Sequence, residues 1–400
     1  MKNNLQFLNS ELHFERRTFL KGLAAVTALQ SAPYFASAVP RKTEKLGLAI
    51  VGLGGYATRC IAPEISSCAH VKLAGVVTGS KEKGVEWSKQ YQFTKDAIYG
   101  YDEIDSIAED DRIDLVHIAL PNSMHAEFAI KCARAGKHVM VEKPMAISSD
   151  ECERMILAAK ESGVLLGVNY RLQWEPHHVK ASEITTSEIF GQASSGNYEF
   201  SWGYARGLQG PNKAKIKKWL LDPLMAGGGA LFDTGVYPIQ AACYLSGRTP
   251  SSVRGMSSKV HPDIFPDGIE ETMSYELLFD DGFQAICRAS YSHNHHQCVT
   301  LGDRSLVEIK GGPREAKGWG SAFTQSGNGQ PNPKALFHGQ REIKLKQTLQ
   351  QAVLLDEFAK CINKSSQKFK ASGEMGLRDI RIIEKIYESS QNGGSLVSII

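Results

Sequence analysis

The stretch "LGLAIVGLGGYA", residues 46–57, decides the fold. An apolar run typical of a buried strand leads directly into glycines and then into residues that begin a helix. The glycines fit GxGxxA, in which they permit a tight turn and a close approach of backbone to a pyrophosphate at the helix N-terminus. The stretch predicts a dinucleotide site rather than a merely structural turn. The predicted cofactor-binding residues here are Gly52, Gly54, Gly55, Tyr56 and Ala57.

Strand-like and helix-like segments alternate after this turn. Apolar runs lie at 71–79, 114–120 and 138–143, and helical patterns lie between and after them at 81–92, 123–136 and 148–163. This alternation predicts an α/β Rossmann domain with a parallel sheet over residues 46–165.

The pattern changes after about residue 175. Longer alternating runs are separated by short turns such as Asp280-Asp281-Gly282. They predict a second domain over residues 166–400, built on an antiparallel sheet. Helical patterns near 347–362 and 376–390 close the chain.

Segment 1–38 has the features of an export signal. Arg16-Arg17 precedes a modest apolar stretch that ends in Ala36-Ser37-Ala38. We expect a twin-arginine signal peptide, removed after Ala38, and a short arm over 39–45. The apolar stretch is too short and too polar to serve as a stable membrane anchor. The expected location is the periplasm, reached in a folded state with the cofactor already loaded.

Charge and cysteine content exclude several classes. The net charge is +3, and the excess of arginine and lysine in the signal leaves about +1 for the remainder, which gives no argument for nucleic-acid binding. The eight cysteines form no CxxC pair, so buried free thiols are expected, with a disulfide left open. "SHNHHQC" (292–298) lacks the carboxylates or helical histidine spacing of a metal site, and we expect a polar loop near the substrate.

The end of the second strand favours NADP over NAD. NAD-binding proteins place an acid there for the ribose hydroxyl. Here no acid occurs before Glu82, and small hydroxyls and a lysine suit a 2′-phosphate. The residues expected to bind it are Thr78, Ser80 and Lys81.

Two further loops follow strands and so belong at the carboxyl edge of the sheet, where ligands bind in such folds. The first carries Pro121, Asn122 and His125 as cofactor contacts, with a plain helix-start role as the alternative for His125. The second, "HVMVEKPMAIS" (138–148), presents Glu142 and Lys143 before Pro144 ends the strand. The isomer of the Lys143-Pro144 bond stays open.

In this order the GxGxxA turn, "LPNSMHAEFAIKCARAGKHVMVEKPMA", "NYR" and "GGGALFDTGVYPI" resemble the Gfo/Idh/MocA oxidoreductase family. The similarity covers nearly all of 46–398 and is greatest to the periplasmic glucose–fructose oxidoreductase branch. It implies tightly bound NADP(H), sugar substrates, and a C-terminal α+β domain whose large open, mostly antiparallel sheet serves in a dimer or tetramer.

The resemblance also implies residue roles. Lys143, Asp233 and Tyr237 are the expected catalytic residues, Glu142, Lys143 and Arg171 contact the cofactor, and Tyr170 joins the catalytic residues in binding substrate. Removing hydride from a sugar carbon requires a base for the hydroxyl proton. A phenol with the ordinary pKa of about 10 is a poor base, and a neighbouring ammonium favours the phenolate. Lys143 is therefore expected to assist Tyr237.

The resulting hypothesis is hydride transfer from C1 of an aldose to the nicotinamide and on to a second sugar. A simple sugar or polyol dehydrogenase, an aldose–aldose oxidoreductase, a dinucleotide-dependent glycosidase and a noncatalytic binding protein are the alternatives. Segment 203–222 departs from the family pattern, so the sugars stay open. "AGGG" (226–229) is either a close approach to the cofactor or a flexible loop.

Overall fold

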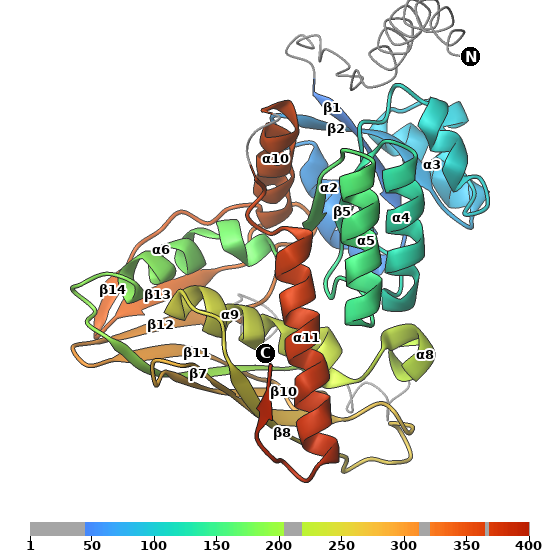
Figure 1. Ribbon diagram of the computed structural model, residues 1–400. Coiled ribbons are helices and arrows are strands. Elements are labelled where there is room, and N and C mark those ends of the chain that lie inside the picture. Colours follow the sequence, from blue (N-terminus) through green and yellow to red (C-terminus); the bar gives the residue numbers. More distant parts are fainter. Residues whose placement is uncertain (1–44, 204–217, 312–320, 365–367, 400) are drawn as a thin grey trace, which may run out of the picture. The chain divides into compact units, whose positions relative to one another are not determined.

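The computed structural model describes residues 45–203, 218–311, 321–364 and 368–399 (Figure 1). The predicted signal peptide, nearly all of the predicted arm and most of segment 203–222 lie outside these residues. Within them, no helix is long and apolar enough to cross a bilayer.

The first sheet contains six parallel strands in the order β3-β2-β1-β4-β5-β6. Adjacent β1 and β4 mark the point where the strand order reverses, and the carboxyl edge at this point is where ligands bind in folds of this kind. The predicted Rossmann domain is thus confirmed. The strands are β1 (Leu46–Val51), β2 (Val71–Val77), β3 (Ile98–Tyr99), β4 (Leu115–Ile118), β5 (His138–Val141) and β6 (Leu166–Val168).

Strand β6 pairs with β5, so this sheet runs past the boundary expected at residue 165. The boundary expected from the sequence therefore falls before the last strand of the first sheet.

Two helices of this domain, α3 (Lys81–Tyr91) and α5 (Ser149–Glu161), begin at polar caps. Ser148 accepts a hydrogen bond from the Glu151 amide at 3.2 Å at the start of α5. The helix after the glycine turn is a π-helical turn over Ala57–Ile61 continued by α2 (Ala62–Ile65). Helix α4 (His125–Arg134) also belongs to the domain.

The second sheet has nine strands in the order β14-β13-β12-β11-β7-β10-β9-β8-β15. Only the β7–β10 pairing is parallel, which confirms the expected mostly antiparallel sheet. Its strands are β7 (Ala193–Ser201), β8 (Ser252–Ser258), β9 (Thr272–Leu278), β10 (Gln284–Ser290), β11 (His295–Gly302), β12 (Leu306–Gly311), β13 (Lys334–His338), β14 (Arg341–Ile343) and β15 (Val397–Ser398).

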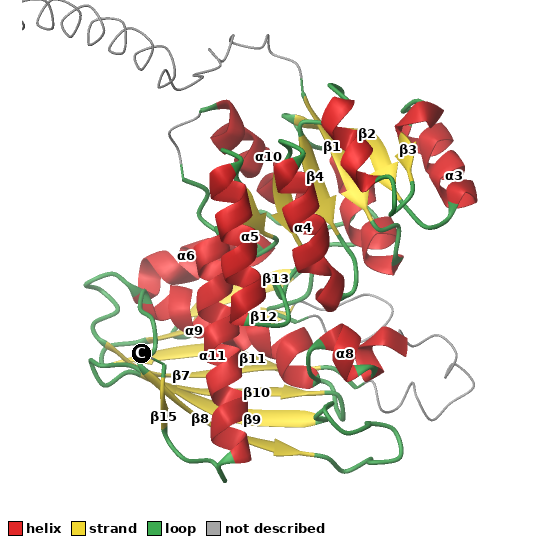
Figure 2. Cartoon of the chain, turned by 45° about the vertical axis from the view of Figure 1, so that its right-hand side comes forward, coloured by secondary structure: helices red, strands yellow, loops and turns green. Residues whose placement is uncertain are grey.

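Helices α6 (Pro176–Thr185), α9 (Val236–Ser246) and α11 (Gly373–Gln391) cover one face of this sheet, as Figure 2 shows. Along β10 the side chains alternate between buried and exposed, with Ala285 and Cys287 inward and Ile286 and Arg288 outward. The outward side chains belong to the opposite face of the sheet, over which the described chain places no helix.

Helix α10 (Gln350–Asn363) follows strand β14 of the second sheet in sequence but packs on the first domain. Glu64 of α2 accepts hydrogen bonds from the amides of Gln351 (2.8 Å) and Ala352 (3.2 Å) at the start of α10. A carboxylate suits this position because the first amides of a helix lack partners within it. Helix α10 thereby ties the end of the chain to the glycine turn.

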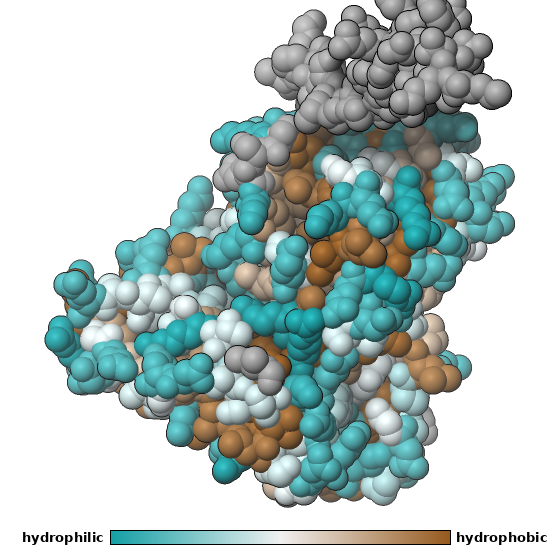
Figure 3. Space-filling model, viewed as in Figure 1, coloured by the Kyte–Doolittle hydropathy of each residue, from teal (hydrophilic) through white to brown (hydrophobic). Residues whose placement is uncertain are grey.

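The core extends through both sheets. All eight cysteines are free, buried thiols, and seven of them belong to this core. Burial raises the pKa of Cys68 and of Cys132 to about 12. The expectation of buried free thiols is confirmed. On the surface seen in Figure 3, separate hydrophobic areas lie among a majority of hydrophilic residues.

Candidate active site

The glycine turn after β1 has the shape of a phosphate cradle. Gly52 has a φ of +96°, and a Cβ there would lie 2.7 Å from the Ala119 carbonyl oxygen, so only glycine fits. Gly54 and Gly55 are exposed, and a Cβ on Gly54 would meet no atom within 4 Å. The open space lies at the start of a helix, where backbone amides favour an anion. These residues fit a dinucleotide pyrophosphate.

The rest of the turn anchors it. Ala57 is fully buried, and the Tyr56 hydroxyl accepts a hydrogen bond from Gln351 of α10 at 2.8 Å. Arg59 also lies beside this turn, although the sequence analysis did not select it. It is exposed, and a Cβ on Gly55 would lie 3.4 Å from its guanidinium. Its position as a basic residue two places after the GxGxxA motif could have indicated it.

The polar side chains after β2 bond partly to one another within the turn. Thr78 accepts a hydrogen bond from the Ser80 amide at 3.1 Å, and the Ser80 hydroxyl donates to Glu82 at 3.0 Å. The backbone amide of Glu82 and the Ser80 hydroxyl lower the pKa of the Glu82 carboxyl. Lys81 is exposed. Of the three residues expected at a 2′-phosphate, Lys81 is exposed, whereas Thr78 and Ser80 form hydrogen bonds within the turn itself.

The loop after β4 joins other protein segments. Asn122 donates to the Ala226 carbonyl at 2.8 Å, and half-buried Pro121 precedes it. His125 is fully buried, with ring nitrogens 3.0 Å from the carbonyl oxygens of Leu120 and Pro144. Burial lowers the pKa of His125. His125 begins α4 and presents no atom to a ligand, which corrects its predicted cofactor contact in favour of the helix-start alternative.

The Glu-Lys-Pro segment leaves β5 through a cis Lys143-Pro144 bond. Glu142 is buried and accepts hydrogen bonds from Asn169 beyond β6 and, at 3.1 Å, from His117 of β4. It therefore joins the carboxyl ends of three neighbouring strands. Lys143 projects from this braced edge.

The three expected catalytic residues meet there, although two come from the second domain. A π-helical turn (Leu231–Gly235) and the start of α9 carry Asp233 and Tyr237. Lys143 Nζ donates to the Asp233 carbonyl at 2.6 Å and pairs with its carboxylate at 3.2 Å. The same nitrogen lies 5.0 Å from the centre of the Tyr237 ring.

Lys143 stays charged in this position. Burial alone would lower its pKa, but the neighbouring Tyr237, Asp233 and Glu142 outweigh burial and raise it. The ammonium is thus held against Asp233 and over the ring rather than on the Tyr237 oxygen.

Arg171 makes the hydrogen bond to that oxygen. Its guanidinium donates to the Tyr237 hydroxyl at 3.0 Å, and it is almost completely buried. The neighbouring Tyr170 lies elsewhere, because its buried hydroxyl faces α11, where burial and Asp379 raise its pKa. The structure thus brings Arg171 into the site but keeps Tyr170 away from the Lys143–Tyr237 group.

The glycines of "AGGG" serve close protein packing, which is neither of the two alternatives considered. A Cβ on Gly229 would lie 2.1 Å from the Glu270 carbonyl oxygen, and one on Gly228 would lie 2.2 Å from the Tyr387 hydroxyl. The Glu270 carboxylate accepts hydrogen bonds from the amides of Gly229 (2.8 Å) and Leu231 (2.7 Å). This buried glutamate, which no sequence signal marked, holds the start of the segment bearing Asp233.

The histidines of "SHNHHQC" turn toward Glu199. His293 and His295 lie 2.9 and 3.0 Å from its carboxylate oxygens. His296 packs instead on Phe200, which in turn contacts Tyr237. No group of three or more metal-binding side chains with suitable geometry occurs among the residues that the structure describes.

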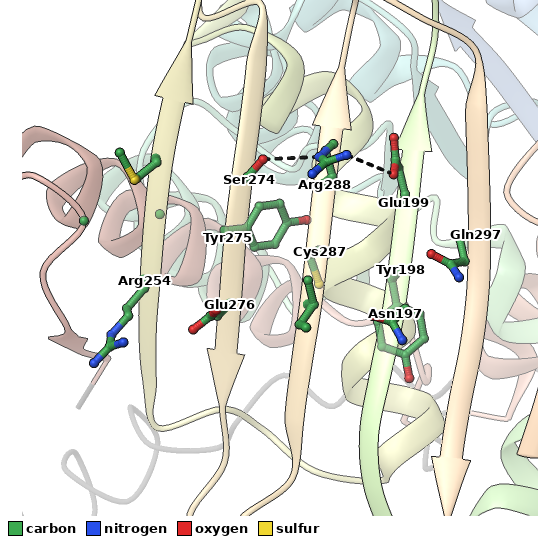
Figure 4. Close-up of a pocket in the computed structure, with 14 residues that line it drawn as sticks. Asn197, Tyr198, Glu199, Arg254, Ser274, Tyr275, Glu276, Cys287, Arg288 and Gln297 are labelled. Atoms are coloured by element: carbon green, nitrogen blue, oxygen red, sulfur yellow. Dashed lines mark hydrogen bonds and ion pairs between the residues drawn. The ribbon is translucent and has the colours of Figure 1, made fainter.

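A shallow hollow lies on the open face of the second sheet (Figure 4). Arg254, Glu276 and Arg288 line it, and Figure 4 shows Arg288 between Ser274 and Glu199. None of its lining residues belongs to the predicted site. It is therefore a feature of the sheet face and not of the candidate active site.

Comparison with known proteins gives consistent matches. Residues 46–170 match the oxidoreductase family with an NAD-binding Rossmann fold, and residues 178–311 match the GFO/IDH/MocA C-terminal domain. Aldose–aldose oxidoreductase from Caulobacter crescentus, solved with glycerol, is 32% identical with a TM-score of 0.79, covering 89% of this chain and all of that one.

Two further matches are more distant. D-xylose 1-dehydrogenase [NADP(+)] of Haloarcula marismortui is 26% identical over 86% of this chain and 90% of its own length. An inositol dehydrogenase homologue from Azotobacter vinelandii, solved with NAD+, is 17% identical with a TM-score of 0.72 over 90% of this chain and 98% of that one, and it shows the shared fold alone.

A buried histidine beside this site contributes stability that depends on pH. His178 of α6 contacts the Tyr244 hydroxyl and the Ala322 carbonyl (2.8 Å), next to Phe323, whose carbonyl accepts a hydrogen bond from Arg171. Burial lowers the pKa of His178 to about 4. Its stabilising contribution is therefore complete above the unfolded value of about 6.5 and is lost as the pH falls toward 4.

We expect the free energy of unfolding to drop between pH 6.5 and 4, with His178 contributing up to about 3 kcal/mol of the change. Urea denaturation of the wild type and His178→Gln across this range measures the contribution. The difference in stability between the two proteins should shrink as the pH falls. A constant difference would contradict the assignment of His178 as a neutral, buried group.

Proposed function

Because the chain belongs to the Gfo/Idh/MocA oxidoreductase family, we propose that it is a periplasmic, NADP(H)-dependent sugar oxidoreductase. The observation that carries the proposal is the meeting of Lys143, Asp233 and Tyr237 at the carboxyl edge of a Rossmann sheet. A phenol beside two cations, next to a dinucleotide cradle, suits removal of a hydroxyl proton together with a hydride.

The proposed reaction oxidises an aldose at C1. Tyr237 takes the proton of the C1 hydroxyl, and Lys143, aligned by Asp233, donates a hydrogen bond to the same hydroxyl oxygen. The nicotinamide, when bound, accepts the hydride and later returns it. In the second half-reaction Tyr237 protonates the carbonyl oxygen of the acceptor sugar, so the protein ends in its starting state.

The acceptor has two candidates. The sequence resemblance favours a ketose such as fructose. The 32% identity to the Caulobacter aldose–aldose oxidoreductase favours a second aldose instead. The two differ only in which sugar reoxidises the reduced enzyme, so one experiment separates them.

The cofactor is proposed to be NADP(H), held tightly enough to accompany the protein through export. Exposed Lys81 at the end of β2 supports a 2′-phosphate contact. The xylose dehydrogenase relative is also named for NADP(+). Glu82, bonded to Ser80, is the feature that opposes this preference.

A second copy of the chain is the proposed occupant of the open sheet face. Arg254 lies directly opposite Glu276 there, and Ile286 and Met256 are 57% and 64% exposed between charges of both signs. Such a face can pair with its own two-fold copy. The mature protein should sediment as a dimer or tetramer and Ile286→Glu as a smaller species. A monomeric wild type would refute this proposal.

Export has a separate test. The periplasmic fraction should contain protein that begins near residue 39, and a fraction that lacks it would refute export.

The main test uses purified mature protein without added nucleotide. Glucose should produce the absorbance of reduced nicotinamide, and either fructose or a second aldose should abolish it. Tyr237→Phe should retain its nucleotide but lose about 10²–10⁴-fold in the rate of reduction, because it lacks the proton acceptor.

Three results would contradict this proposal. Nucleotide-loaded protein that responds to no aldose would remove the sugar reaction. Release of phenol from an aryl glycoside would favour the glycosidase alternative. Unchanged kinetics in Tyr237→Phe would remove the assigned base.

The cofactor preference has its own test. In nucleotide-stripped protein, Lys81→Met should weaken NADP+ binding about tenfold, because it removes a charge-assisted contact, and should leave NAD+ binding unchanged. Lys83→Met is the matched control, since Lys83 is also an exposed lysine on the same helix. Equal effects on both nucleotides, or NAD(H) as the copurifying species, would reverse the preference.

A further inference from the structure

Arg171 is a buried cation that forms no ion pair with a carboxylate among the described residues. It is 1% exposed, and its hydrogen bonds go to the Gln350 side chain (2.8 Å), the Phe323 carbonyl (2.7 Å) and the Tyr237 hydroxyl (3.0 Å), with a long contact of 3.5 Å to Gln325. None of these groups is a carboxylate. In the described part of the chain, no carboxylate forms an ion pair with this guanidinium.

A buried charge is costly unless an opposite charge offsets it. Two phenols, Tyr237 and Tyr56, neighbour the guanidinium, and Tyr237 accepts a hydrogen bond from it. The buried Glu64 carboxylate interacts with it electrostatically but forms no ion pair with it. Burial would lower the pKa of Arg171, but the two phenols raise it, so the guanidinium stays charged. Tyr56 is the less suitable of the two to ionise, since burial and Glu142 hold its pKa well above the ordinary value.

Lys143 is engaged elsewhere. Its ammonium has two contacts to Asp233, at 2.6 and 3.2 Å, and it lies over the Tyr237 ring rather than at the phenol oxygen. Tyr237 is therefore flanked by two cations with different positions. One donates a hydrogen bond to the Tyr237 oxygen, and the other lies against Asp233 and over the Tyr237 ring.

We propose that Arg171, and not Lys143, is the cation that stabilises the deprotonated oxygen of Tyr237, so that Arg171 is a catalytic residue and Lys143 acts on the substrate hydroxyl. This inference rests on the proposed oxidoreductase function. In the oxidising step the substrate O–H bond breaks, its proton moves to the Tyr237 oxygen, and the C–H electron pair leaves with the hydride. The guanidinium offsets the charge on Tyr237 before the step and donates to a neutral phenol after it.

Gln350→Glu is the sharpest variant. It replaces the neutral oxygen 2.8 Å from Arg171 by a carboxylate of the same size, at the start of a helix, where a negative charge is tolerated. The new ion pair should neutralise Arg171 without removing it. The pH at which the single-turnover rate of nicotinamide reduction is half-maximal should then rise by at least one unit. Arg171→Met should shift it in the same direction.

Gln173→Glu is the matched control. Gln173 is also buried, undergoes the same substitution, and bonds to Gln240 rather than to Arg171. It should leave the half-maximal pH of reduction where the wild type has it. If Arg171→Met does not fold, Gln350→Glu and Gln173→Glu decide the matter by themselves.

A second readout needs no substrate. The ultraviolet difference between each protein and its Tyr237→Phe counterpart follows ionisation of this phenol alone, and the pH at which it appears should also rise in Gln350→Glu. Rates that fall by one factor at every pH, with neither midpoint moved, would overturn the inference and leave Arg171 a structural residue. If no aldose reduced the nucleotide bound to the wild type, the proposed function would be refuted instead. The ultraviolet titration would still test whether Arg171 stabilises the ionised Tyr237.

Discussion

The contact between Lys143 and Asp233 is the interaction on which the site depends. Lys143 leaves the end of β5 in the first domain, whereas Asp233 lies on the π-helical turn before α9 in the second. Neither domain contains the site alone. The contact places the phenol of Tyr237, one helical turn further on, over the carboxyl edge of the parallel sheet, which is where ligands bind in folds of this kind.

Much of the surrounding structure holds the two ends of this contact in place. Glu142 joins β4, β5 and the residue after β6, and His125 links the loops at Leu120 and Pro144. On the other side, Glu270 holds the amides before Asp233. These buried polar groups are satisfied by hydrogen bonds, as they must be away from water. They hold the segments that carry Lys143 and Asp233 in place.

The two cations around Tyr237 contact different parts of its side chain. Arg171 reaches the phenol oxygen, while Lys143 lies over the ring and against Asp233. A guanidinium can donate several hydrogen bonds in a plane, so Arg171 can contact Tyr237 while it also bonds Gln350 and Phe323. A lysine in the same place offers only a point charge on a flexible chain.

Periodicity and the GxGxxA turn are local patterns, so the residues alone predicted the Rossmann domain and the second sheet. The family resemblance predicted that Lys143, Asp233 and Tyr237 act together. The partner of the Tyr237 oxygen, the burial of His125 and the packing role of Gly228 and Gly229 became visible in the folded chain. Those depend on contacts between residues far apart in the chain, such as Arg171 with Phe323, or Gly229 with Glu270. The strand Leu166–Val168 is a further example, because its pairing with β5 assigns it to the first sheet.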